Sequence, residues 1–276
     1  MNFANVFLVL AAVTSNYAAQ EHLPPEAVVR VRFAPSASKI SLGEPVTVNM
    51  ILRNDSSEPL VAHLGRNRQE DIGFVITDPE GGNKEVKQLP KEGIYRLGDV
   101  SIGAHEEFAS QIPLGLWYRF DKIGEYKIQV KFGSRVTSKS EKPANVSIDG
   151  AFTLSVRPAD AAHLASVCSE LLARVSSAPT YDKALAAANA LASIPDSIAI
   201  PYLRDATQYW HLQPITVNAI EQIGTSESVE ALIGFLKSSD PDTRALSRSA
   251  LSRIQMETKN DTEKQTIRDA LKEYRP

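Results

Sequence analysis

Three short segments in the C-terminal half share one pattern, and this repetition constrains the fold more than any other feature of the chain. Each has an alanine, an aliphatic residue, two variable positions and an isoleucine: Ala190–Ile194, Ala219–Ile223 and Ala250–Ile254. Successive copies begin about 30 residues apart, which is a spacing typical of stacked helical hairpins. One hairpin cannot bury the apolar stripes of both its helices, so repeated hairpins must pack against each other.

The segment 224–254 has the features of one complete hairpin. Gly224 suits the left-handed conformation that ends a helix, and Thr225 supplies a side-chain oxygen to cap the next one. Asp240 and Pro241 then start a second helix, with an acceptor at the cap and proline in the first turn. The apolar residues of each helix recur at helical spacing on one face: Val229, Leu232, Ile233 and Leu236, then Leu246, Ala250, Leu251 and Ile254.

The link at 240–244 and the ending at 253–254 resemble the HEAT-like repeat family in its short bacterial form, although Gln255 stands where that form has glycine. The resemblance is specific over 224–254 and looser over 181–223. It implies an α-solenoid, whose members usually bind proteins, and it brings no catalytic residues with it. The alternative is an ordinary helical bundle.

From residue 28 to residue 156 the apolar residues follow a period of two instead. Alternation of this kind puts one face of a β-strand in the core and the other in water. Turn sequences separate the alternating stretches at 54–59, 78–82 and 121–124. Several short strands with no helical pattern between them predict an antiparallel β-sandwich. The alternating residues include Val46, Val48, Met50, Leu52, Ile72, Phe74, Ile76, Tyr126, Ile128, Val130, Phe132, Phe152, Leu154 and Val156.

The segment 117–130 resembles the end of an immunoglobulin-like domain, in which a Gly-x-Tyr step leads into a late strand. Gly124 and Tyr126 occupy these positions, and the resemblance implies that the tyrosine hydroxyl bonds to the backbone of the preceding turn. Ile128 stands where the family has a cysteine, so the expected fold is an immunoglobulin-like sandwich without a disulfide. Such sandwiches host many functions, and the resemblance therefore says little about activity.

These patterns predict a multidomain β + α chain, with an N-terminal antiparallel immunoglobulin-like β-sandwich over 26–157 and a C-terminal HEAT-like α-solenoid over 158–276. Residues 1–19 have the apolar core and small-residue end of a signal peptide. A disordered apolar tail or a first core strand are the alternatives for that segment. No cysteine follows it as a lipoprotein anchor would need, and no apolar stretch is long enough to cross a bilayer. We therefore expect a secreted or periplasmic protein of bacterial type.

Composition and motifs give no sign of an active site. The net charge of −3 comes from interspersed charges, so no nucleic-acid-binding surface is expected. The 5 histidines are scattered, and the 1 cysteine, Cys168, falls on the apolar stripe of a predicted helix. No phosphate-binding glycine loop, Gly-x-Ser-x-Gly or His-Glu-x-x-His motif occurs. We expect no catalytic residue, no cofactor and no metal.

Five residues of the helical half are candidates for contact with a protein partner. Tyr209, Trp210 and His211 lie in a link between predicted helices, where large aromatic residues are not needed to close a turn. Arg244 and Arg248 are about one helical turn apart on the polar side of their helix, where an acidic partner could bind. The alternatives are a wedge between neighbouring helices for the aromatic residues and a solvated surface for the arginines.

Trp117 and Tyr118 are candidates for stacking on a sugar, with filling of the sandwich core as the alternative. The leading hypothesis is an exported, non-catalytic scaffold or adaptor that binds another protein through its helical repeats. A glycan-binding module of the cell envelope is the first alternative. A hydrolase or lyase whose site is assembled from distant segments is the second.

Overall fold

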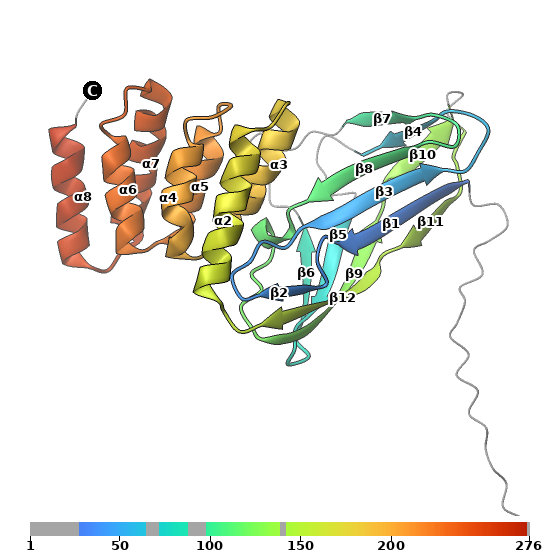
Figure 1. The fold of residues 1–276 in the computed structure, drawn as a ribbon, viewed down its shortest axis with the longest axis horizontal. Coiled ribbons are helices and arrows are strands. Elements are labelled where there is room, and N and C mark those ends of the chain that lie inside the picture. The colour runs from blue at the N-terminus through green and yellow to red at the C-terminus, as the bar shows by residue number, and fades with distance from the viewer. Residues whose placement is uncertain (1–27, 65–71, 88–97, 139–141, 275–276) are drawn as a thin grey trace, which may run out of the picture.

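The computed structural model describes residues 28–64, 72–87, 98–138 and 142–274. The predicted signal peptide at 1–19 lies outside these ranges. Strands occupy the chain from Val29 to Arg157 and helices from Ala161 to Glu273. Figure 1 shows the helices side by side beyond one end of the sheets. Within the described residues, no helix is both long and apolar enough to cross a membrane.

The strands of the described residues form three sheets, ordered β11-β1-β3-β8, β10-β4-β7 and β2-β12-β9-β5-β6. Their bounds are β1 Val29–Pro35, β2 Lys39–Ser41, β3 Val48–Asn54, β4 Leu60–His63, β5 Ile72–Thr77, β6 Asn83–Lys87, β7 Asp99–Ile102, β8 Glu107–Ile112, β9 Gly124–Phe132, β10 Arg135–Ser138, β11 Val146–Asp149 and β12 Ala151–Arg157. The inward faces of these strands share one hydrophobic core, in which Val48, Met50 and Leu52 are each 0% exposed.

The sheets include parallel pairs, which corrects the predicted antiparallel immunoglobulin-like β-sandwich. β1 lies parallel to β11, with Val29 opposite Val146, and β12 lies parallel to β2, with Val156 opposite Ile40. Alternating hydrophobicity cannot reveal this pairing, because a strand buries the same residues whichever way its neighbour runs.

Tyr126 ties β9 to the turn that precedes it. Its side chain is fully buried, and its hydroxyl accepts a hydrogen bond from the Lys122 N–H at 2.9 Å and donates one to the Lys122 carbonyl at 3.1 Å. This is the contact that the Gly-x-Tyr sequence predicts. Gly124 has a φ of 134°, and a Cβ there would lie 2.7 Å from Pro79, so the turn requires glycine.

The helices are α2 Ala161–Ser176, α3 Tyr181–Ala192, α4 Ile200–Ala206, α5 Gln213–Ile223, α6 Ser226–Phe235, α7 Pro241–Glu257 and α8 Asp261–Glu273. Polar residues cap several of them as the sequence predicts. The Asp240 carboxylate accepts the Asp242 and Thr243 N–H groups at the start of α7, and Gly224 ends α5 with a φ of 69°. Two 3-10 turns, at Leu114–Leu116 and Ser197–Ala199, complete the described elements.

The seven described helices share one continuous hydrophobic core, which extends from Leu164 in α2 to Ala270 in α8. The structure does not show these helices as a solenoid, so the predicted HEAT-like α-solenoid is corrected to a set of packed helices. The repeated tails mark the buried faces of α3, α5 and α7, where Leu191, Ile220 and Leu251 are each 0% exposed. Any close-packed group of helices needs such faces. The repetition therefore predicts burial and not the path that successive pairs follow.

Candidate functional site

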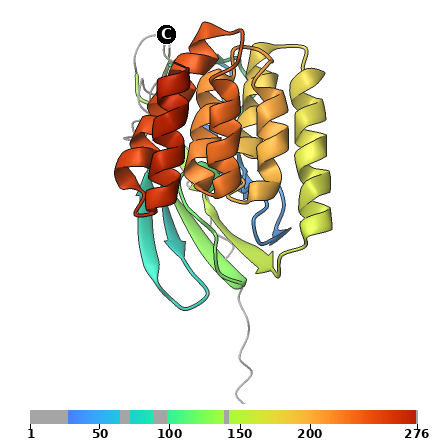
Figure 2. The ribbon, with the colours of Figure 1, turned by 90° about the vertical axis from the view of Figure 1, so that its left-hand side faces the viewer.

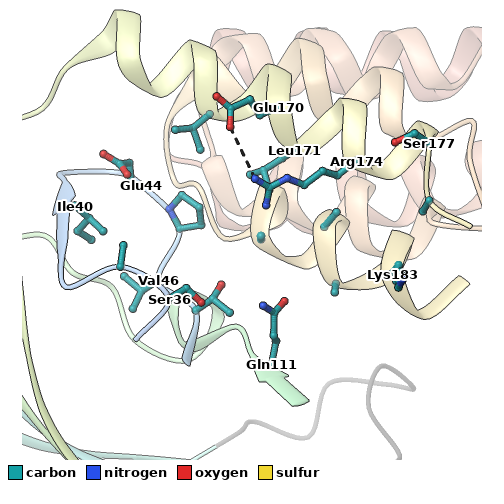
Figure 3. Close-up of a pocket in the computed structure, with 18 of the residues that line it drawn as sticks. Ser36, Ile40, Glu44, Val46, Gln111, Glu170, Leu171, Arg174, Ser177 and Lys183 are labelled. Atoms are coloured by element: carbon teal, nitrogen blue, oxygen red, sulfur yellow. Dashed lines mark ion pairs between the residues drawn. The ribbon is translucent and has the colours of Figure 1, made fainter. Parts of the chain in front are cut away.

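A crevice of about 710 Å³ lies between the β-sheet half and the first two helices. Its β-side wall is the connection from β1 to β3, at 36–47, together with Gln111 near the end of β8. Its helical wall is α2, the α2–α3 turn and α3. Figure 3 shows that these side chains converge from segments far apart in the sequence. A site of this kind is typical of ligand binding, since pockets occur preferentially where domains meet.

The floor of the crevice is apolar. Ile40 and Val46 contribute from the β-sheet half, and Leu171 and Ala187 contribute from α2 and α3. All four are buried, because they also belong to the hydrophobic cores of their own halves. A ligand in the crevice would therefore cover apolar atoms that already have fixed positions, which lowers the entropy lost on binding.

The rim has charged side chains, and one polar contact between a histidine and a carboxylate joins the two halves there. His163 Nε2 on α2 lies 3.1 Å from Glu44 Oε1, and the same oxygen accepts the Ser41 N–H at 2.7 Å. The Glu44 side chain is 14% exposed, so this oxygen is held between two partners. The contacts of Glu44 with His163 and Ser41 hold the 36–47 connection against α2 at the entrance of the crevice.

Two cations stand on the helical wall of the crevice. Arg174 lies 3.9 Å from Glu170 one turn away on α2, and the figure shows this pair along the wall (Figure 3). Lys183, in the first turn of α3, is exposed and forms no ion pair within the described residues. Lys183 is therefore the rim charge that remains available to a ligand carboxylate.

Two glycines allow the halves to approach closely. A Cβ on Gly43 would lie 3.3 Å from Leu164 Cδ2 of α2, and Gly43 has a φ of 93°. A Cβ on Gly115 would lie 3.1 Å from the Ser193 Cβ just after α3. An added Cβ at either glycine would be in tight contact with the helical half, and its neighbour would have to shift by a few tenths of an ångström.

The described residues of the crevice contain no cluster of metal ligands and no hydrogen-bonded nucleophile–base pair. Within the described residues no three histidine, cysteine or carboxylate side chains gather as a metal would require. The described hydroxyls and carboxylates of the rim do not form a nucleophile and base pair with hydrogen-bond contact. The described crevice thus combines an apolar floor with charged edges.

Cys168 is expected to be inert in the folded protein. It is 0% exposed on α2, and burial together with the negative charge of Asp196 raises the pKa of its thiol to about 11. At pH 8 we expect alkylation by iodoacetamide to be about 100-fold slower than for an exposed thiol, since only the thiolate reacts. Mass spectrometry over time would measure this, with urea-unfolded protein as the control that labels fully. Rapid labelling of folded protein would contradict the expectation.

The structure places Tyr209, Trp210 and His211 in the α4–α5 connection, away from the crevice residues. Tyr209 packs against the helical core, whereas Trp210 is 40% exposed and His211 is exposed. Trp210 and His211 have φ of 49° and 55°, which non-glycine residues rarely adopt. Tyr209 thus matches the wedge alternative, and the two exposed residues remain candidates for partner contact.

Replacing His211 with glycine is expected to stabilise the protein by about 0.5–1 kcal/mol, because glycine adopts the left-handed conformation without a Cβ clash. Urea unfolding would measure the change. Gln208→Gly is the matched control, since Gln208 is exposed in the same connection and has no positive φ, so glycine there is expected to destabilise. Equal effects of the two substitutions would show that position 211 holds no backbone strain.

Arg244 and Arg248 are engaged within the chain. Arg244 Nη1 donates to the carbonyls of Ser238 and Ser239 at 2.7 and 2.9 Å, and so closes the α6–α7 turn. Arg248 donates to the Leu271 carbonyl at 3.2 Å and to the Tyr274 carbonyl at the end of α8. The Arg248 bonds satisfy carbonyls at the end of α8, where a helix leaves its last carbonyls without a partner. They give both side chains a structural role that the sequence did not indicate.

Trp117 and Tyr118 pack within the β-sheet half. Trp117 lies edge-on to Phe74 at 5.5 Å between ring centroids, and Tyr118 lies edge-on to Phe120 at 4.9 Å. Both are only partly exposed, and the Lys84 ammonium lies 5.7 Å from the Tyr118 ring centroid. Neighbouring side chains thus already contact the rings on which a sugar would stack, and this packing matches the core-filling alternative.

Sequence reasoning missed the crevice residues, among them Glu44, His163 and Lys183. They come from three segments whose local patterns show a loop and two helix starts. One signal was available: Asp160 caps α2 and His163 lies in its first turn, close to the predicted domain boundary. Nothing in the sequence indicates that the 36–47 connection is the opposite wall.

No protein-family profile matches this sequence, and no curated protein matches it. Among solved structures, the CARDB domain of the PF1109 protein from Pyrococcus furiosus is 12% identical with a TM-score of 0.27, covering 48% of this chain and 94% of that one. The alkylpurine DNA glycosylase AlkC from Pseudomonas fluorescens is 13% identical with a TM-score of 0.25, covering 48% of this chain and 31% of that one. With TM-scores this low, neither protein lends this chain a function.

Proposed function

We propose that this chain is an exported, non-catalytic adaptor that holds part of a protein partner in the crevice between its β-sheet half and helices α2 and α3. The observation that supports the proposal is the crevice itself, which combines a buried apolar floor with a charged rim. An apolar centre with polar edges is the usual anatomy of a protein-binding surface. The proposed export rests on the apolar segment at 1–19.

The chemistry of the crevice favours a protein segment over other ligands. The rim has charges of both signs, Glu44 and Glu170 beside Arg174 and Lys183, which does not suit a polyphosphate backbone. The described residues offer no metal cluster that would prepare a bound substrate for reaction. A peptide has apolar side chains for the floor and charged side chains for the rim.

Photo-crosslinking in the cells that make the protein tests this proposal. A photoreactive phenylalanine at position 183 is expected to form adducts with a partner, whereas the same residue at position 259 is not. Lys259 is the matched control because it is exposed between α7 and α8, away from the crevice. Adducts at both positions, or at neither, would count against the crevice as the binding site. Cell fractionation of the tagged full-length chain tests the proposed export, and retention in the cytoplasm would contradict it.

The charge on Lys183 gives a quantitative form of the same test. With the crosslinked partner in hand, Lys183→Glu is expected to weaken binding about 10-fold, because a rim cation that meets a carboxylate becomes a repulsive group. Lys259→Glu makes the same change of net charge elsewhere and should alter the dissociation constant by less than about 2-fold. Titration calorimetry would measure both variants, and equal weakening would indicate a general charge effect.

A further inference from the structure

β8 is the outer strand of its sheet in the described part of the chain, because it pairs with β3 and no other described strand. It runs toward the helices, and the figure shows its end facing α2 and α3 (Figure 1). Gln111, the second-last residue of β8, is at the same time part of the crevice wall. Among the described strands, the unpaired edge of β8 therefore leads into the crevice.

The register shows which β8 amides face outward. Asn54 donates to the Glu106 carbonyl at 3.0 Å, and this pair is in line with the β3–β8 register. Hydrogen-bonded pairs alternate along an antiparallel ladder, so Phe108 and Ser110 also exchange bonds with β3. The N–H and C=O groups of Ala109 and Gln111 then point away from the sheet. Both residues are exposed.

The charge of the adjoining wall indicates what would pair with this edge. Lys183 on α3 and Arg174 on α2 stand at the crevice end of β8, and only Arg174 has a carboxylate partner among the described residues. A strand added to β8 would bring its own end between these cations. A carboxylate at that end would meet Lys183 while the preceding residues form the ladder.

We propose that the partner segment binds in extended form as an additional strand on β8 and places a carboxylate in the crevice beside Lys183. This inference rests on the proposed function and specifies the ligand: a peptide about as long as the 6-residue β8, with an acidic residue or a C-terminal carboxylate at its crevice end. Backbone hydrogen bonds to Ala109 and Gln111 supply affinity, and the charge sets the direction in which the peptide lies.

Ala109→Pro tests strand addition with little change to the fold. Proline removes the outward N–H and its ring blocks an approaching strand, while the bonds from β8 to β3 remain. Ser101→Pro is the matched control on β7, an outer strand of another described sheet. The bond from the Leu64 N–H to the Gly98 carbonyl, at 3.2 Å, sets the β4–β7 ladder so that the Ser101 N–H also faces outward.

The probes are peptides selected from a random library displayed on phage against the full chain, then synthesised with a fluorescent label. We expect acidic peptides whose affinity falls about 10-fold with Ala109→Pro and with Lys183→Glu, and by less than about 2-fold with Ser101→Pro and Lys259→Glu. Methylating single peptide nitrogens is expected to weaken binding at every second residue. This readout needs no protein variant, so it decides the matter if Ala109→Pro does not fold.

The outcomes separate this inference from the function on which it rests. Weakening by Lys183→Glu alone, with no alternation in the methylated peptides, would keep the crevice as a binding site and overturn strand addition. Selection of no peptide at all would also overturn it, while leaving the crosslinking test of the crevice untouched. Peptides indifferent to both Ala109→Pro and Lys183→Glu would count against the crevice and the strand together.

Discussion

Asn54→Ala is expected to lower the free energy of unfolding by about 2–4 kcal/mol, the largest effect of any single polar substitution proposed for this protein. Asn54 is 0% exposed, and its Nδ2 donates to the carbonyls of Glu58, Ile102 and Gly103 at 2.8, 3.3 and 2.9 Å. Its Oδ1 accepts the Ser56 N–H at 2.9 Å. Alanine would remove all of these bonds from a fully buried position, and carbonyls that are partly or wholly buried would lose an amide donor.

Urea unfolding would measure this loss, and Asn49→Ala on the same strand is the matched control. The Asn49 side chain makes only exposed bonds: its Oδ1 accepts from Ser36 Oγ at 3.4 Å and from Gln111 Nε2 at 3.2 Å. We expect its removal to cost less than about 0.5 kcal/mol. If both variants lost equal stability, the buried amide would not be what connects the end of β3 to the β7–β8 turn.

Gly43→Val is expected to destabilise the protein by about 2–3 kcal/mol and to displace α2 from the β-sheet half. Two physical effects combine at this position. The φ of 93° is a conformation that a β-branched residue strongly disfavours, and the added Cβ would lie 3.3 Å from Leu164 Cδ2. Unfolding in urea would measure the stability, and the Cys168 alkylation rate would report whether α2 has become looser.

Two further glycines separate the backbone effect from the contact. Gly81 has a similar φ of 87° and no atom within 4 Å of an added Cβ, so Gly81→Val carries the strain alone. Gly115→Ala carries a contact alone, with Ser193 at 3.1 Å and no positive φ. We expect faster Cys168 alkylation only for the Gly43 variant and, to a smaller extent, for the Gly115 variant. Faster alkylation in Gly81→Val would show that the effect does not come from the junction between the halves.

The junction also links stability to the proposed binding role. Gly43 and Gly115 let the backbone of the β-sheet half approach α2 and α3, and the Glu44–His163 pair closes the same seam. We expect a side chain at either glycine to push the two halves slightly apart, and so to alter the crevice between them. We therefore expect Gly115→Ala to change the free energy of peptide binding by more than it changes the free energy of unfolding.

The sequence by itself determined the local structure. The alternation in β3 places Val48, Met50 and Leu52 in the core, and the Gly-x-Tyr step sets the Tyr126 hydroxyl on the Lys122 backbone. The cap at Asp240 starts α7 where an oxygen acceptor is followed by proline. These features depend on neighbours within a few residues, so they can be predicted from the sequence.

Only the tertiary structure decided how these pieces meet. Residues far apart in sequence meet in the parallel β1–β11 and β12–β2 pairs, in the packing of α2–α8 and in the seam at Gly43. The outer position of β8 among the described strands follows from the same long-range pairing. Hydrophobic periodicity indicates which face of a helix or strand is buried. It does not indicate the neighbouring element, because many different elements could cover the same apolar face. The crevice forms between elements whose packing partners are not indicated by the sequence, so no local pattern predicted it.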